Sequence, residues 1–145
     1  MDVNSKAYEE LLKKRPLNVQ ARFGSESMGL VSGRDIVAAA KEVDSIVLAA
    51  NARHPLIIKA VLQAAKKKNA AVLIELAKSE STYCGANYDN IPDHALKYSS
   101  EMGHGAVFGL HVDHYAIKGH EDVLKGVAHL SKILVNGPCT GWPPS

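Results

Sequence analysis

The sequence predicts an α/β fold in which about four parallel strands alternate with helices. Short apolar runs of strand length are separated by segments whose apolar residues recur at three- and four-residue spacing. Each run is continuously apolar instead of alternating with polar residues, which is typical of a parallel sheet covered on both faces. Right-handed crossovers are therefore expected between successive strands.

The first elements form an N-terminal region of helices and loop, residues 1–44. A helix from Asn4 to Lys14 is predicted to end before Pro16, because proline interrupts a helix interior. A loop then leads to a second helix over Arg34–Val43, and the first predicted strand is Ser45–Ala50.

The next elements alternate in the same way. Pro55 is well placed for a first helical turn, and one apolar face continues from there to Lys68. The second predicted strand is Ala70–Leu76. A polar loop over Ala77–Ile91 leads to a helix that begins at Pro92 and ends near Gly103 or Gly105.

The last two strands are predicted at Ala106–Val112 and Lys132–Val135. Glu121 and Asp122 suit the first turn of the helix between them. The βα units thus cover residues 45–136, and a tail rich in glycine and proline follows at 137–145. We expect a single domain over 1–145. A small doubly wound sheet and the first half of a (β/α)8 barrel both fit, since a whole barrel needs about 250 residues.

Composition argues against several functions. Formal net charge is +2, and the basic residues are scattered without interleaved aromatics, so no nucleic-acid partner is expected. No apolar stretch approaches the roughly 18 residues of a membrane span. The cysteines, Cys84 and Cys139, form no disulfide framework. The N-terminus lacks a signal-peptide pattern. We therefore expect a cytoplasmic protein.

The residues most suited to chemistry occur in Gly109–His114, at the end of the third predicted strand. Histidine and aspartate are common metal ligands and acid–base groups. Alternation puts His111 and Asp113 on one side of the strand, and His114 can join them only if the strand ends there. Active sites of parallel sheets lie at such ends. The alternative is a polar strand end that only satisfies loop backbone groups.

An apolar strand that ends in Leu-His-x-Asp-His, here Leu110–His114, is similar to the signature of class II fructose- and tagatose-bisphosphate aldolases. Asn51 after the first strand, the second strand Val72–Leu76 and the opening helix Tyr8–Lys14 are also similar in order and approximate spacing. The resemblance covers most of residues 45–136, and it implies the N-terminal half of a (β/α)8 TIM barrel.

The resemblance also implies roles for individual residues. Asp113 is at the position of the catalytic proton donor and His114 at that of a Zn²⁺ ligand, while Asn51 and Ser79 are implied to bind substrate. The implied reaction belongs to glycolysis and carbohydrate metabolism. It is the zinc-dependent, reversible aldol cleavage of a ketose bisphosphate to dihydroxyacetone phosphate and glyceraldehyde 3-phosphate.

The sequence departs from the family pattern at three positions. Asn136 stands where an aspartate that serves as an alternative metal ligand is usual. Ala77 stands where a substrate-contacting serine is frequent, with Ser79 two residues on. Tyr115 stands where glycine commonly follows the His-x-Asp-His motif.

We expect an incomplete active site in this chain alone, because the resemblance puts the other zinc-binding histidines and a phosphate loop in the second half of the barrel. A phosphorylated sugar is the expected substrate, and self-association or a complementary half-barrel is expected to cover the sheet. The alternative is a non-catalytic barrel-like partner subunit or a truncated relic. A small open-sheet module for a phosphorylated ligand is a third hypothesis, although no Gly-x-Gly-x-x-Gly loop follows the first strand.

Overall fold

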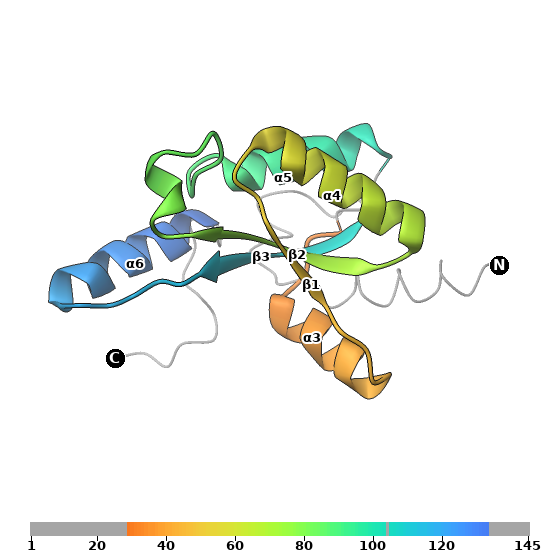
Figure 1. Cartoon of the computed structure of the whole chain (residues 1–145), viewed down its shortest axis with the longest axis horizontal. Helices are drawn as coiled ribbons and strands as arrows, with labels where there is room; N and C mark the ends of the chain where they lie inside the picture. The colour runs from red at the N-terminus through yellow and green to blue at the C-terminus, as the bar shows by residue number, and fades with distance from the viewer. Residues whose placement is uncertain (1–28, 104, 134–145) are drawn as a thin grey trace.

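The computed structural model describes residues 29–103 and 105–133, and in these ranges helices and strands alternate (Figure 1). The predicted first helix at Asn4–Lys14 and the tail at 137–145 lie outside the described residues. The elements are α3 (Gly33–Glu42), β1 (Leu48–Asn51), α4 (Pro55–Lys68), β2 (Ala71–Ala77), the short 3-10 helix η1 (Glu80–Thr82), α5 (Ile91–Glu101), β3 (Val107–Asp113) and α6 (His120–Ile133).

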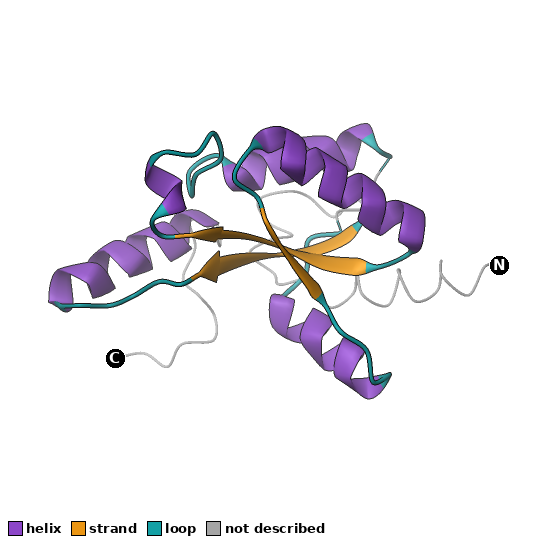
Figure 2. Cartoon of the chain, in the orientation of Figure 1, coloured by secondary structure: helices purple, strands orange, loops and turns teal. Residues whose placement is uncertain are grey.

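The three strands form one open, fully parallel sheet in the order β1-β2-β3. Figure 2 shows the strands in the middle, with α4 and α5 on one face and α3 on the other. The predicted α/β class with a parallel sheet is therefore confirmed, and the arrangement is that of part of a (β/α)8 barrel.

The main core lies between the sheet and the helices α4 and α5. Alternate residues of β2 point into it, namely Val72, Ile74 and Leu76, and Ile74 and Leu76 have no exposed surface. Ile58 and Leu62 of α4 are also fully buried there. Burying a side chain of this size stabilises the fold by about 1.5–3 kcal/mol, so this core contributes strongly to the stability of the sheet.

A second, smaller core covers the amino-terminal part of the opposite face. Ile36 of α3 and Val107 of β3 are buried in it, with Leu73 of β2 packed against them. Gly109 permits this contact: a Cβ there would lie 2.9 Å from Leu73 Cδ2 and 3.2 Å from the Gly33 Cα. Since α3 covers the amino-terminal part of this face, the positions further along the strands remain for polar side chains.

The far edge of β3 is partly paired by the segment that precedes α3. Leu30 forms a parallel bridge with Phe108. The Phe108 amide donates to the Gly29 carbonyl at 2.7 Å, and the Val31 amide donates to the Phe108 carbonyl at 2.9 Å. The predicted loop before α3 thus ends as a short extension of the sheet.

The predicted helix at Pro55–Lys68 is confirmed to the residue. The second and third strands are each displaced by one residue, and β1 begins at Leu48, three residues later than predicted. Each strand reaches one residue further than its apolar run, to Asn51, Ala77 and Asp113. The reason is that backbone pairing, which defines the strand, tolerates a polar side chain at the strand end.

The predicted fourth strand, Lys132–Val135, is wrong at its first two residues, because α6 continues through Lys132 and Ile133. No glycine or proline interrupts the chain between Gly126 and Gly137, so the helix can continue into the apolar run. The other two residues of that run lie outside the described ranges.

No helix in residues 29–103 and 105–133 is both long enough and apolar enough to cross a membrane.

Candidate active site at the carboxyl ends of the strands

Polar side chains form a row across the sheet near its carboxyl end. Asn51 of β1 is paired in register with Glu75 of β2, and Glu75 is paired with His111 of β3. Asp113, two residues further along β3, is paired with Ala77. Registered neighbours share a face and side chains alternate along a strand, so these polar groups all lie on the face that α3 covers further down.

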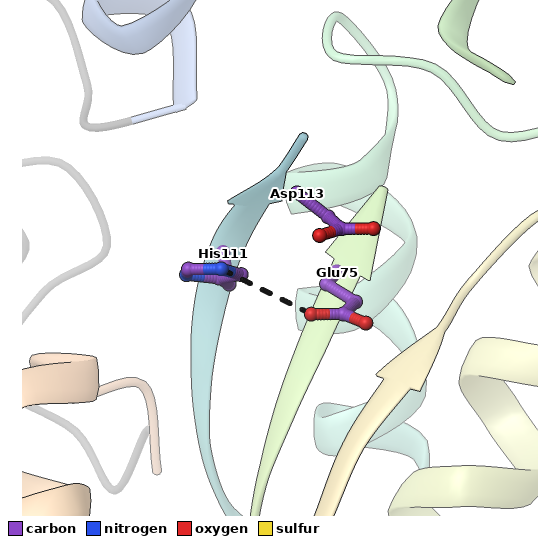
Figure 3. Close-up of side chains that lie close together, drawn as sticks. All are labelled: Glu75, His111 and Asp113. Atoms are coloured by element: carbon purple, nitrogen blue, oxygen red, sulfur yellow. Dashed lines mark ion pairs between the residues drawn. The ribbon is translucent and has the colours of Figure 1, made fainter. Parts of the chain in front are cut away.

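Three of these groups converge. Ligand atoms of Glu75, His111 and Asp113 all lie within 4.8 Å of one another. The His111 Nε2 is 4.0 Å from a Glu75 carboxylate oxygen. Figure 3 shows Glu75 and His111 side by side on neighbouring strands, with Asp113 beyond them toward the strand ends. The Glu75 side chain is 16% exposed and that of His111 is 51% exposed, so the group opens to solvent on the β3 side.

His114 follows β3 directly and leaves the strand geometry. Its φ of 45° lies in the left-handed region, which non-glycine residues seldom adopt. The strand ends at Asp113, one residue after the predicted end at Val112. The His114 Nε2 lies 3.5 Å from the Asp113 carboxylate, and the side chain is 87% exposed. The His111 imidazole therefore lies on the face of the strand, whereas the His114 imidazole is exposed to solvent.

The residues around His114 do not by themselves make a complete zinc site. Zinc in catalytic sites is bound by three protein ligands and keeps one open position. Within the described ranges, the Asp113 carboxylate is the acidic group paired with the His114 imidazole. Of the zinc ligands that the resemblance implies, this position supplies the His114 imidazole, and the carboxylate beside it belongs to Asp113, the implied proton donor.

The Asn51 side chain is held by a buried carboxylate. Glu80, only 5% exposed, accepts hydrogen bonds from the Arg53 Nε and, at 3.3 Å, from the Ala77 amide. The Asn51 side chain is a further hydrogen-bond partner of this carboxylate. Burial alone would raise the pKa of Glu80, but the hydrogen bonds from these three residues outweigh it and lower the pKa below its usual value. This network fixes the end of β1.

One atom of the Asn51 side chain takes no part in this hydrogen-bond network. Its side-chain oxygen is buried and has no hydrogen-bond partner among the described residues. A buried acceptor without a donor is costly, by about 1–3 kcal/mol, and such atoms are uncommon in folded proteins. The Asn51 side-chain oxygen is thus an unsatisfied acceptor that the protein covers at the end of β1.

Ser79 lies beyond β2, in the turn that precedes η1. Its backbone carbonyl accepts a hydrogen bond from the Thr82 hydroxyl at 2.8 Å, and Ser79 itself is exposed. It is at the same end of the sheet as Asn51 and Asp113. Within the described ranges, no hydrogen bond joins Ser79 to the other predicted site residues.

Tyr115, which departs from the family pattern, has a clear structural role. Its ring lies under the Lys78 Nζ at 4.6 Å and is 6.5 Å from the ring of Tyr88. Lys78 also binds the Asp122 carboxylate at 2.7 Å. That hydrogen bond is the main reason that the pKa of Asp122 is lowered. Tyr115 and Lys78 together connect the end of β2 to the start of α6.

Sequence reasoning missed Glu75 as a site residue and did not assign a role to His111. Glu75 occurs inside an otherwise apolar strand, and it precedes the end of β2 by the same two residues by which His111 precedes the end of β3. Counting back from both strand ends would have paired the two residues. The signal was present, but it required the exact strand ends.

A comparison with protein families agrees with this geometry. The family model described as "Fructose-bisphosphate aldolase class-II" matches residues 31–133, well over half of the chain. The match includes all three strands, the Asn51–Glu75–His111 row and the His-x-Asp-His motif. No curated protein matches the chain. The chain belongs to the class II fructose-bisphosphate aldolase family.

Proposed function

We propose that this chain takes part in the reversible aldol cleavage of a ketose bisphosphate, fructose- or tagatose-bisphosphate, to dihydroxyacetone phosphate and glyceraldehyde 3-phosphate. The observation that carries the proposal is the position of Asp113. It is the last residue of β3, directly before His114, within the stretch that matches the aldolase family. Groups at the carboxyl ends of parallel strands face the substrate in barrel enzymes.

Asp113 is proposed as the acid–base residue. In the cleavage direction its carboxylate accepts the proton of the hydroxyl next to the breaking carbon–carbon bond, and that carbon becomes the aldehyde. In the condensation direction the carboxylic acid returns the proton to the aldehyde oxygen. The side chain is 25% exposed, which supports this role because the group is accessible to substrate and still held by the strand.

Zinc is the proposed cofactor, and His114 is proposed as one of its ligands. Bound at such a site, zinc supplies Lewis-acid stabilisation of the negative charge that develops on the ketone oxygen. The largely exposed His114 imidazole fits a ligand that meets a metal at the surface of this sheet. Further ligands are proposed to come from outside the described residues.

Asn51 and Ser79 are proposed to bind the substrate. The amide of Asn51 is oriented by Glu80, and its buried oxygen lacks a partner among the described residues. This supports a role as hydrogen-bond acceptor for a substrate hydroxyl. Ser79, exposed at the end of β2, offers a hydroxyl to the phosphate or to a sugar hydroxyl.

A partner that completes the sheet is also proposed, either a second copy or a complementary half-barrel. In the described ranges β1 pairs with β2 alone. Ile46 and Leu48, next to and on this edge, are 94% and 65% exposed. A groove of about 350 Å³ runs between β1 and α4, with apolar lining that includes Leu48, Val61 and Val72. An apolar strand edge of this kind favours addition of another strand. The partner and the enzyme are proposed to work in the cytoplasm.

One observation favours a second candidate function, that of a non-catalytic barrel-like subunit. Among the described residues, His114 has a carboxylate beside it but no second imidazole. A subunit of this kind would bind a partner barrel through the β1 edge without cleaving sugar itself.

The purified 145-residue chain should be assayed for cleavage of both bisphosphates, with zinc added and with a chelator. The proposal predicts cleavage at protein concentrations at which the chain self-associates and so completes the site. This cleavage should disappear with the chelator and return when zinc is restored. Cleavage that persists in the chelator would contradict the zinc-dependent mechanism. Absence of cleavage at every protein concentration, including those at which the chain self-associates, would favour the non-catalytic subunit.

A further inference from the structure

We infer that Glu75, His111 and Asp113 form a site for a divalent transition-metal ion that is separate from the His114 position. The site goes beyond the proposed function. A metal bound to the Asp113 carboxylate would withdraw this group from proton exchange with a substrate, so the two roles exclude each other at any one time.

The geometry of the trio is close to that of a metal site. One imidazole nitrogen and two carboxylate oxygens all lie within 4.8 Å of one another. Ligand atoms about 2.0–2.2 Å from a tetrahedral ion are separated by about 3.4 Å. The 4.0 Å between His111 Nε2 and Glu75 Oε2 therefore has to shorten by about 0.6 Å, and a pair at the 4.8 Å limit by about 1.4 Å. Side-chain rotation would have to supply this change.

The backbone that carries the trio is held on both sides. Glu75 and His111 are registered partners in neighbouring strands. The Glu75 carbonyl accepts the Ala52 amide at 2.8 Å, and the Asp113 carbonyl accepts the Lys78 amide at 3.3 Å. Ligands on paired strands keep their relative positions better than ligands on loops, so little ordering is needed when an ion binds.

The charges of the trio are unbalanced without a cation. The Glu75 side chain is 84% covered by protein, the complement of its exposed 16%. Within the described ranges, no lysine or arginine forms an ion pair with Glu75 or Asp113. Arg53, a cation at the same end of the sheet, is bound to Glu80. His111 beside Glu75 and His114 beside Asp113 balance these carboxylates only while their imidazoles carry a proton.

The unbalanced charge of the trio favours a bound cation independently of the distances between the ligand atoms. Two neighbouring carboxylates, one of them mostly buried, repel each other, and a bound dication removes that repulsion. One nitrogen and two oxygen ligands suit zinc, cobalt or manganese better than they suit the hard cations calcium and magnesium, which prefer oxygen alone. The remaining coordination positions would be taken by water.

The trio differs from the His114 position in a way that an experiment can separate. All three residues lie in the described part of the chain, so the site needs no ligand from another chain or domain. His114, on the other hand, is not among the residues whose ligand atoms converge there. Metal binding by the isolated chain that depends on Glu75 and His111 is therefore specific to the trio.

The test is a titration of the 145-residue chain with Co²⁺, followed by visible absorption, and with Zn²⁺, followed by calorimetry. The variants are Glu75→Gln, His111→Gln and His114→Gln, with Asp44→Asn as an exposed control carboxylate. The unmodified chain is expected to bind one ion. Glu75→Gln and His111→Gln are each expected to weaken binding by at least about tenfold, since even the loss of an outer-shell partner costs about 10–100-fold. Asp44→Asn is expected to bind as the unmodified chain does. His114→Gln is expected to keep the ion at the trio, because His114 is not among the residues whose ligand atoms converge there.

Two results would overturn the inference: no Co²⁺ binding by the unmodified chain, or binding that is lost in His114→Gln and kept in Glu75→Gln. Circular dichroism melts of every variant check folding, and the half-exposed His111 provides a ligand variant if Glu75→Gln does not fold. Failure of sugar cleavage leaves these binding results standing, because absorption and calorimetry do not depend on turnover. Likewise, binding that follows His114 would leave the proposed aldolase function intact.

Discussion

The Glu75 carboxylate and the His111 imidazole lie at paired positions of neighbouring parallel strands, with Oε2 and Nε2 4.0 Å apart. Asp113 lies two residues after His111 on β3, on the same face of the sheet. The pairing makes the carboxyl end of this small sheet acidic. It also joins the family motif on β3 to a residue of β2 that the motif does not include.

The Glu80 network predicts a specific loss of stability in acid. The pKa of Glu80 is lowered in the folded state from a reference of 4.5, so its contribution is present above that pH and is lost as the pH falls through the folded pKa. Glu80→Gln should therefore show a shallower loss of stability below about pH 4.5 than the unmodified chain. Urea unfolding between pH 3 and pH 7 measures this, and identical slopes for both proteins would contradict the prediction.

The raised pKa of Tyr88 predicts a loss of folding stability at high pH. Burial is the main reason that the pKa of Tyr88 is raised from 10.0 to about 12, and its hydroxyl donates to the Leu76 carbonyl at 3.2 Å. Its contribution is complete below pH 10 and is lost as the pH rises toward 12. Tyr88→Phe should lose about 0.5–1.5 kcal/mol of unfolding free energy at neutral pH, the usual worth of one hydrogen bond. The variant should then be less sensitive than the unmodified chain between pH 10 and 12, and a greater sensitivity would count against the assignment.

Gly109 is predicted to be essential to the packing of α3. A methyl group there meets the Leu73 side chain at 2.9 Å and the Gly33 backbone at 3.2 Å. Gly109→Ala should lower the unfolding free energy by about 1–3 kcal/mol, as overpacking in a tight core does. Gly119→Ala is the matched control, because nothing lies within 4 Å of a Cβ at that position. Equal melting temperatures for the two variants would show that α3 moves away at little cost.

The apolar edge at β1 predicts association that depends on concentration. Leu48→Lys places a charge on an edge residue that is 65% exposed, and it should shift the chain toward monomer in sedimentation velocity. Ile117→Lys alters a residue of similar exposure, 62%, on the connection between β3 and α6. It should leave the association unchanged. If both variants associate as the unmodified chain does, the β1 edge is not the interface.

Local patterns predicted most of the fold. The helix Pro55–Lys68 follows from a proline at its start and an apolar face, and α4 has these bounds. The His54 side chain accepts a hydrogen bond from the Leu56 amide, which secures that start. The prediction of a strand at Lys132–Val135 is wrong at its first two residues because a short apolar run suits a helix and a strand equally well. Tertiary pairing decides between them, and a single sequence does not contain it.

The candidate site was predictable only in part for a related reason. The motif on β3 identified Asp113 and His114 as a local pattern. Glu75 belongs to the site through register, which is set by how β2 and β3 align along their whole length. The hydrogen bond between the side chains of Glu80 and Asn51 likewise joins residues far apart in the sequence. Such relationships come from packing between elements.

The role of Asp113 is tested by the zinc-dependent cleavage rate of fructose- and tagatose-bisphosphate in two matched variants. Asp113→Asn removes the proposed proton-exchanging carboxylate, and Asp44→Asn removes an exposed carboxylate from a turn with left-handed backbone that asparagine tolerates. We expect a loss of about 10²–10⁴-fold for Asp113→Asn, the usual worth of general acid–base catalysis, and an unchanged rate for Asp44→Asn. Cleavage by Asp113→Asn at the rate of the unmodified chain would show that Asp113 is not the acid–base residue.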